Sequence, residues 1–149
     1  MNASHGAIVA CTVEDRPALF DLYRASCPEV PVAAIASDVN EQSIRFWYAC
    51  KSESGEIRVA MFVWASGVVF VLVRPEDVES EEVAAAFLNL AREIRRRLAP
   101  SGVTELSILH STRIQRFGEL LERAGFLSKE LVVARTMHFS AAGEVERKN

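Results

Sequence analysis

Residues 73–83, VRPEDVESEEV, join a strongly apolar segment to a long amphipathic helix, and this junction decides how the chain folds. A strand-to-helix junction is where many α/β proteins bind phosphate, because glycines allow close approach and the first helical N–H groups are free. This junction has no glycine, and it carries five carboxylates but a single arginine. Its position in the chain favours an anion site, whereas its charge opposes one.

The acidic junction also has a purely structural interpretation. Ser80 is a favourable N-cap, and Glu81 and Glu82 in the first helical turn complement the positive end of the helix dipole. The beginning of the helix would then be satisfied by its own sequence rather than by a ligand. We favour this self-capped interpretation over phosphate binding, although the sequence alone leaves both open.

The composition predicts one folded domain. The chain has 149 residues, half of them apolar, and a formal net charge of −3. The negative charge argues against a general surface for nucleic acid or anionic membranes. The apolar residues 59–73 are too few to span a bilayer and are interrupted by Ser66 and Gly67, so we interpret them as a hairpin.

Cys11, Cys27 and Cys50 are widely spaced and odd in number. They form no C-x-x-C pair, and the three histidines lack the spacing of metal ligands. We therefore expect reduced, buried thiols, no metal site and a cytoplasmic protein. The polar N-terminus does not resemble a signal peptide.

Hydrophobic periodicity and turn residues predict six strands and four helical segments. The strands are expected at residues 7–12, 45–52, 56–65, 68–73, 105–109 and 131–139. The helices are expected after Thr12 up to residue 27, as a short piece at 41–44, and at 81–98 and 112–124. Residues 28–40 are expected to form a loop that contains at most one helical turn. This order predicts an α+β fold with a mixed, mostly antiparallel sheet and helices on both faces. It forms one domain over residues 1–139, followed by a polar, mobile tail over residues 140–149.

The segment 56–65 alternates between two faces, as a strand should. One face is expected to carry Ile57, Val59, Met61 and Val63, and the other Arg58, Ala60, Phe62 and Trp64. Aromatic residues on neighbouring predicted strands, Trp47, Tyr48 and Trp64, are candidates for a ligand wall or an oligomer contact. We favour ordinary core packing for them.

Three local signatures, in this order, resemble the GCN5-related N-acetyltransferase (GNAT) superfamily. TVEDRP at residues 12–17 resembles the family's first strand-to-helix junction. VRPE at residues 73–76 resembles the V-x-P-E entry into the acyl-CoA loop, and LLERAGF at residues 120–126 resembles the penultimate helix that ends in Gly-Phe. The resemblance extends over residues 7–139. Compact, divergent members of this family recur in bacterial and phage genomes, so the resemblance also implies that a phage-encoded protein, in the host cytoplasm or the virion, is an alternative to a bacterial cytoplasmic one.

The resemblance implies that acyl-CoA would lie where the sheet splays between the strands at 68–73 and 105–109. In that family, a loop of the type Arg/Gln-x-x-Gly-x-Gly/Ala holds the pyrophosphate, and an amine attacks the thioester. A backbone N–H of the fourth strand polarises the carbonyl group. Carried onto this sequence, the residues in contact with the cofactor would be Leu72, Val73, Arg74 and Ser80.

The sequence departs from this pattern at its functional points. The loop positions that should offer Arg and Gly read VESEE at residues 78–82. In the family, a Tyr on the penultimate helix often protonates the leaving thiolate, and an Asn is frequent earlier on that helix. These two positions fall at Leu121 and near Ile114 in this sequence. The remaining catalytic candidates are His110 and Ser111, after the fifth strand, where a histidine could act as base or acid. The alternative, which we favour, is that Ser111 or Thr112 caps the next helix and His110 is an exposed turn residue.

We therefore expect a GNAT-fold protein that has lost standard acetyl-CoA chemistry and binds no cofactor. It would act as a protein-binding or structural module, with a protein partner or a second copy of itself. The alternative is an atypical N-acetyltransferase that uses acetyl-CoA. No contact with nucleic acid or membrane is expected, given the negative charge and the short apolar runs.

Overall fold

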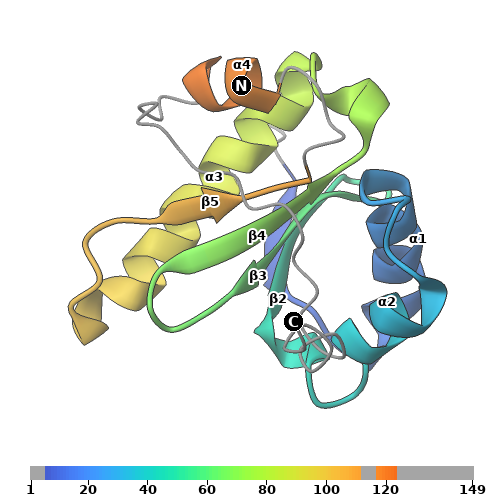
Figure 1. Cartoon of the computed structure of the whole chain (residues 1–149). Helices are drawn as coiled ribbons and strands as arrows, with labels where there is room; N and C mark the ends of the chain where they lie inside the picture. Colours follow the sequence, from blue (N-terminus) through green and yellow to red (C-terminus); the bar gives the residue numbers. More distant parts are fainter. Residues whose placement is uncertain (1–5, 112–116, 124–149) are drawn as a thin grey trace, which may run out of the picture.

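The apolar run at the centre of the chain forms β4 (Val68–Val73), in a five-stranded sheet of order β1-β2-β3-β4-β5 (Figure 1). The structure is a computed structural model that describes residues 6–111 and 117–123. Each strand from β1 to β4 pairs antiparallel with the next, and β5 pairs parallel with β4. The other strands are β1 (Ala7–Ala10), β2 (Trp47–Lys51), β3 (Ile57–Val63) and β5 (Ser107–Leu109).

Helices cover both faces of the sheet, which confirms the predicted fold class. α1 (Arg16–Ser26) and α2 (Val32–Asp38) lie on one face, and α3 (Glu81–Leu98) and α4 (Phe117–Arg123) lie on the other (Figure 1). Four short 3-10 helices flank these elements: η1 (Val13–Asp15), η2 (Ile44–Phe46), η3 (Pro75–Asp77) and η4 (Ala99–Ser101).

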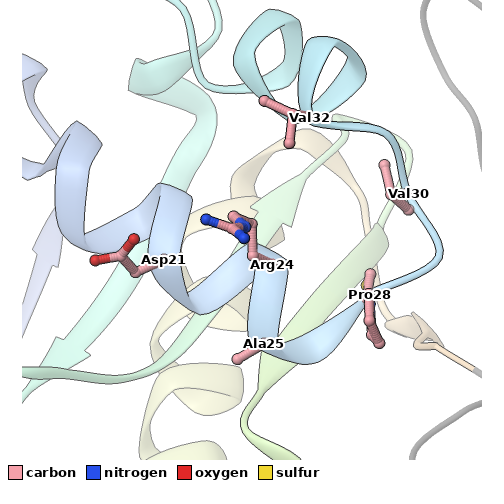
Figure 2. Close-up of a pocket in the computed structure, with 7 residues that line it drawn as sticks. Asp21, Arg24, Ala25, Pro28, Val30 and Val32 are labelled. Carbon is pink, nitrogen blue, oxygen red and sulfur yellow. The ribbon is translucent and has the colours of Figure 1, made fainter.

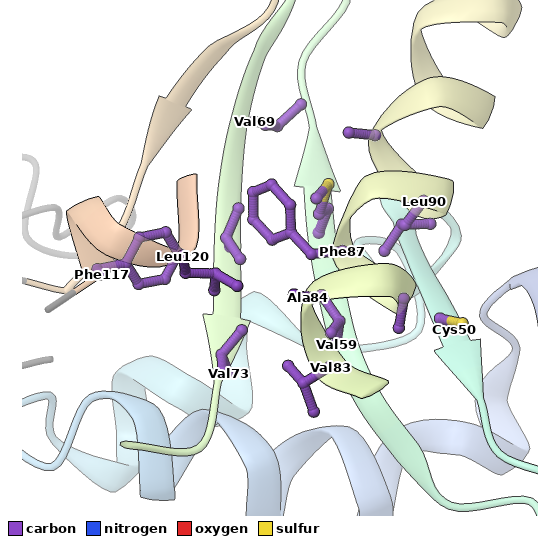
Figure 3. Close-up of a cluster of buried hydrophobic side chains, with 14 of the residues drawn as sticks. Cys50, Val59, Val69, Val73, Val83, Ala84, Phe87, Leu90, Phe117 and Leu120 are labelled. Atoms are coloured by element: carbon purple, nitrogen blue, oxygen red, sulfur yellow. The ribbon is translucent and has the colours of Figure 1, made fainter. Parts of the chain in front are cut away.

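β4 is apolar throughout because its two faces enter two different cores. Val69, Val71 and Val73 pack with α3 and α4, in the cluster that Figure 3 shows around Phe87 and Phe117. Phe70 and Leu72 pack with α1 and α2 on the opposite face. The uninterrupted run at residues 68–73 is therefore a central strand, as the sequence predicts.

A register shift corrects the predicted faces of β3. Cys50 pairs with Val59 but Lys51 pairs with Ile57, so one residue of β3 is left over as a β-bulge. Ile57 consequently packs in the core of α1 and α2, opposite Val59, and Arg58 turns toward Glu82 at the start of α3. From Val59 to Trp64 the predicted alternation is confirmed.

The region between α1 and β2 is more helical than predicted, and the helix lies elsewhere. α2 begins after Pro31, where good helix formers such as Ala33 and Ala34 follow a proline whose φ suits a helix start. The short helical piece expected at 41–44 lies further along the chain, as η2. The Asn40 side chain accepts the N–H groups of Gln42 and Ser43 and forms a turn over residues 41–43, so the helical residues begin only at Ile44.

Other boundaries differ by a few residues or lie outside the described ranges. α3 has the predicted bounds, whereas β5 begins two residues later than predicted. The described part of the predicted helix at 112–124 is α4. The strand expected at 131–139, the tail at 140–149 and the Gly-Phe pair at 125–126 lie outside the described residues.

Candidate functional site

The acidic junction between β4 and α3 satisfies its own backbone. The Asp77 N–H donates to the Arg74 carbonyl at 2.9 Å, and the Ser80 N–H donates to the Asp77 carbonyl at 3.0 Å. The Ser80 hydroxyl accepts the N–H of Val83 at 3.2 Å, as predicted for an N-cap. Several of the N–H groups that could hold a phosphate are thus already hydrogen-bonded within the junction.

Carboxylates dominate the charge around this helix start. Glu76, Glu79, Glu81 and Glu82 are exposed, and Glu82 pairs with Arg58 at 3.3 Å. Burial, followed by the charge of Glu76, raises the pKa of Asp77 above its ordinary value, and the nearby Arg58 and Arg74 only partly offset this. The positive charge of Arg74 therefore acts on Asp77, an acidic residue of the same junction, and lowers its pKa.

The end of β4 is bonded to α1 instead of to β5. β5 pairs only with Val68 to Phe70, so β4 extends three residues beyond its parallel partner. Val68 accepts a hydrogen bond from Trp64 on the β3 side, and alternation along the strand therefore directs the bonding groups of Val73 away from β3. The N–H and C=O groups of Val73 therefore point to the β5 side of β4, beyond the last residue that pairs with β5.

Ser26, at the last turn of α1, occupies this position. Its hydroxyl accepts the N–H of Val73 at 2.8 Å and donates to the Val73 carbonyl at 2.7 Å. The Ser26 side chain is fully buried, and so are Leu72 and Val73. The backbone of Val73 is therefore satisfied by a side chain of the same molecule.

The segment after Ser26 also contacts the residue that follows β5. Ser111, which is buried, donates its hydroxyl to Glu29 at 3.4 Å and hydrogen-bonds the side chain of Cys27. Burial, followed by the charge of Glu29, raises the pKa of the buried Cys27 thiol to about 12. Residues 26–29 thus connect Val73, at the end of β4, with Ser111, which follows β5.

His110 and Ser111 are neighbours in sequence, but they face different surroundings. The His110 ring stacks on Phe117 of α4, with centroids 4.0 Å apart and planes 5° apart, and its Nδ1 lies 3.0 Å from the Ser111 carbonyl oxygen. Burial lowers the pKa of His110. His110 is half-buried, so its interpretation as an exposed turn residue is wrong. A catalytic role for this pair stays a prediction.

Two cavities among the described residues lie away from the acidic junction. The larger, of about 380 Å³, lies beside the C-terminal half of α1 (Figure 2). Its walls are Asp21, Arg24, Ala25, Cys27, Pro28, Val30 and Val32. The smaller, of about 120 Å³, lies under the aromatic side chains of β2, β3 and β4. Neither is lined by Leu72, Val73, Arg74 or Ser80.

The three aromatic candidates do not share one face. Trp47 is buried and faces α1 and α2 together with the half-buried Trp64, whereas Tyr48 faces α3 with the Arg97 guanidinium 5.1 Å from its ring centre. The three cysteines are buried free thiols, as expected. Among residues 6–111 and 117–123, no group of His, Cys, Asp or Glu side chains could hold a metal ion, and no helix could cross a membrane.

Sequence reasoning missed Ser26. Its signal was its spacing from Leu19, Leu22 and Tyr23, which places it on the buried face of α1. A small polar residue at such a position needs a buried hydrogen-bond partner, and here that partner is the strand backbone. The sequence could indicate that Ser26 has a buried partner, but not that the partner is Val73.

Comparisons with other proteins agree with this architecture. The chain matches no protein-family model and no curated protein sequence. Among solved structures it is similar to the aminoglycoside N-acetyltransferase AAC(6')-Iy in complex with CoA, with a TM-score of 0.62 and 17% identity over 91% of this chain and 97% of that one. It is also similar to TTHA1254 from Thermus thermophilus, with a TM-score of 0.53 and 20% identity over 88% of this chain and 96% of that one. The sheet order, the helices on both faces and these likenesses show that the chain has a GNAT-like fold.

Proposed function

We propose that this protein is a GNAT-fold module that has lost standard acetyl-CoA chemistry and acts by binding another protein. The observation that carries the proposal is the pair of hydrogen bonds between Ser26 and the backbone of Val73. A cofactor arm lying between β4 and β5 would have to displace a fully buried side chain and leave its partners unsatisfied. The residues present therefore do not fit acyl-CoA in the manner that the fold implies.

The charge of the junction supports the same conclusion. A diphosphate at the start of α3 would approach Glu79, Glu81 and Glu82, and each repulsive pair costs on the order of 1 kcal/mol at about 4 Å even in water. The Ser80 hydroxyl already caps the helix, so the gain from binding an anion there is reduced.

The surface that we assign to a protein partner lies around the larger cavity (Figure 2). Val32 is 56% exposed, and it lines this cavity with Pro28 and Val30. Asp21 and Arg24 from α1 add one charge of each sign at its edge. An apolar centre with a charged rim is typical of protein contact surfaces.

Calorimetry with acetyl-CoA and with CoA, each at millimolar concentration, tests the loss of cofactor binding. We expect no saturable heat from either compound. Saturable binding of acetyl-CoA would overturn the proposal, because it would show that Ser26 and the acidic junction do not exclude the cofactor.

The protein-binding part has its own test. Partners isolated from the native host with the wild-type chain should be lost with Val32→Glu and retained with Ala33→Glu, which places the same charge on an exposed neighbouring residue. Light scattering would identify a second copy of the chain as the partner. The proposed surface would be contradicted if the chain were a monomer and every isolated partner bound the two variants equally.

A second candidate function is an atypical acetyl-CoA-dependent N-acetyltransferase. It is supported by the similarity, over nearly the whole chain, to a structure solved in complex with CoA. In that case His110 or Ser111 would assist the chemistry, and Arg74 would approach a phosphate. If acetyl-CoA binds, Arg74→Ala should weaken the binding, and an unchanged affinity would remove Arg74 from the site.

A further inference from the structure

The smaller cavity has an unusual wall. Its volume of about 120 Å³ is enclosed mainly by five aromatic rings on the α1 and α2 face of the sheet. The rings belong to Tyr23, Trp47, Phe62, Trp64 and Phe70. Neighbouring rings meet edge to face or tilted: the Trp47 and Phe62 centroids are 5.2 Å apart, and those of Phe62 and Trp64 are 4.8 Å apart. Rings set at steep angles to one another form a box rather than a stack.

One carboxylate completes this aromatic box. Asp38, at the end of α2, is the only charged residue among those that line the cavity. Its carboxylate accepts the Tyr23 hydroxyl at 2.8 Å, and its backbone carbonyl accepts the indole N–H of Trp47 at 3.0 Å. Burial, followed by the charge of Asp38, raises the pKa of Tyr23, so the phenol stays protonated and keeps the carboxylate in place.

We propose that this cavity binds a quaternary ammonium group. Aromatic faces attract cations through the ring quadrupole, and the attraction is strongest for desolvated rings. Three of the rings that line this cavity, those of Trp47, Tyr23 and Phe70, belong to buried residues. The Asp38 carboxylate adds a complementary charge at the wall. This inference is independent of the proposed protein contact surface, which lies around the other cavity.

The chemistry of the wall favours a fully substituted ammonium over a primary one. A primary ammonium carries three N–H donors, and burial without three acceptors is costly. Apart from Asp38, the polar side chains at the wall are Ser43, the Tyr23 phenol, which donates to Asp38, and Trp47, which is itself a donor. The cavity is only slightly smaller than the roughly 150 Å³ cavity that accommodates benzene in another protein, so one small headgroup suits its size.

The two tryptophans of the chain both line this cavity, so intrinsic fluorescence can measure occupancy without a label. Tetramethylammonium and choline should each change the emission saturably at millimolar concentrations. The neutral isostere 3,3-dimethylbutan-1-ol, which has the shape of choline without its charge, should bind at least about tenfold more weakly. A peptide with a trimethyl-lysine distinguishes the source of the group: tighter binding than free choline would indicate a modified protein, and weaker binding a free metabolite.

Variants assign the signal to the cavity. Asp38→Asn keeps the shape of the side chain and removes its charge, and should weaken choline binding at least about fivefold. The matched control is Asp21→Asn, an exposed aspartate on α1 that lies outside the aromatic box and should leave binding unchanged. Far-ultraviolet circular dichroism checks that both variants fold.

Clear results would overturn the inference. The absence of any saturable change with tetramethylammonium, choline or the trimethyl-lysine peptide on the wild-type chain would exclude a quaternary ammonium site. Equal affinity for choline and its neutral isostere would show that the cavity binds by shape alone. Binding of an unmodified lysine peptide as tight as that of the trimethylated one would exclude the proposed preference for a substituted ammonium.

Discussion

The two ends of β4 differ in whether a cavity lies beside them. At the end that leads to α3, Ser26 and Ser80 satisfy backbone groups and no described cavity is lined by Val73. At the opposite end, Phe70 borders a cavity of about 120 Å³ walled by aromatic rings. At the end where this fold is expected to hold a ligand, the chain's own serines bond the backbone, and the end without such an expectation borders a cavity.

The difference shows that a fold does not fix the place of its function. The strand order and the helices are those of a GNAT-like fold, yet ligand space depends on a few side chains at the strand ends. A single serine on α1 changes the chemistry available beside Val73. Substitutions at one end of β4, compared with substitutions elsewhere, test this difference through their effect on stability.

The largest loss of stability is expected from Leu72→Ala, at the end of β4 that leads to α3. Leu72 is fully buried against α1, so the substitution leaves a cavity in a well-packed region and should cost about 2–5 kcal/mol of unfolding free energy. Urea denaturation measures it. Phe62→Leu, at the half-exposed rim of the aromatic box, is the comparison and should cost less than about 1.5 kcal/mol. Equal losses would remove the packing contrast between the two ends.

Ser26→Ala should have the next largest effect. It leaves the buried N–H and C=O of Val73 without their partner, and about 1–3 kcal/mol is lost for a buried polar group left unsatisfied. Ser66→Ala, in an exposed turn, is the matched control and should be neutral. A loss no greater than that of the control would show that water or another group readily replaces Ser26 at the end of β4.

Ser80→Ala should cost about 1 kcal/mol, because the first turn of α3 loses its N-cap. Thermal or urea unfolding measures the loss, and Ser101→Ala, at an exposed position in η4, is the control. If Ser80→Ala were neutral, the self-capped interpretation of the acidic junction would lose its main support.

The smallest effect concerns pH. Because burial lowers the pKa of His110 below its ordinary 6.5, the unfolded chain binds this proton more readily than the folded one. The stability that neutral His110 contributes is therefore fully present above pH 6.5, and it decreases as the pH falls below 6.5. His110→Gln should reduce the fall in stability between about pH 7.5 and 5.5, measured by urea denaturation. Identical pH profiles would show that protonated His110 is tolerated beside Phe117.

The sequence predicts most of the fold, because strong periodicity determines it. The apolar run of β4, the amphipathic pattern of α3 and the cap at Ser80 all indicate their structure locally, and the structure confirms them. The bulge beside Ile57 could not be predicted, because it depends on the register between two strands. α2 is longer than the single helical turn that was predicted, because prolines and small residues resemble a loop when the apolar stripe is as short as Ile35 alone.

The candidate site was predictable only in part. Charge and the missing glycines indicated an unfavourable phosphate site at residues 78–82. The contact between Ser26 and Val73 joins residues far apart in the chain, and no local pattern specifies such a partner. The sequence indicated the aromatic box only in part. Trp47 and Trp64 were candidates for a ligand wall, although core packing was favoured, and the third candidate, Tyr48, lies on the opposite face of the sheet. The position of Asp38 beside them could not be predicted, because it comes from a separate helix.

Because Cys27 is buried, the rate at which its thiol is alkylated can measure local opening of the structure. With its pKa raised to about 12, the thiol holds almost no thiolate at neutral pH while the structure is closed. Alkylating reagents should therefore modify it only when the last turn of α1 detaches from the strands. Because Cys27 follows Ser26 directly, its rate of modification would record how often, and how fast, the space between β4 and β5 opens.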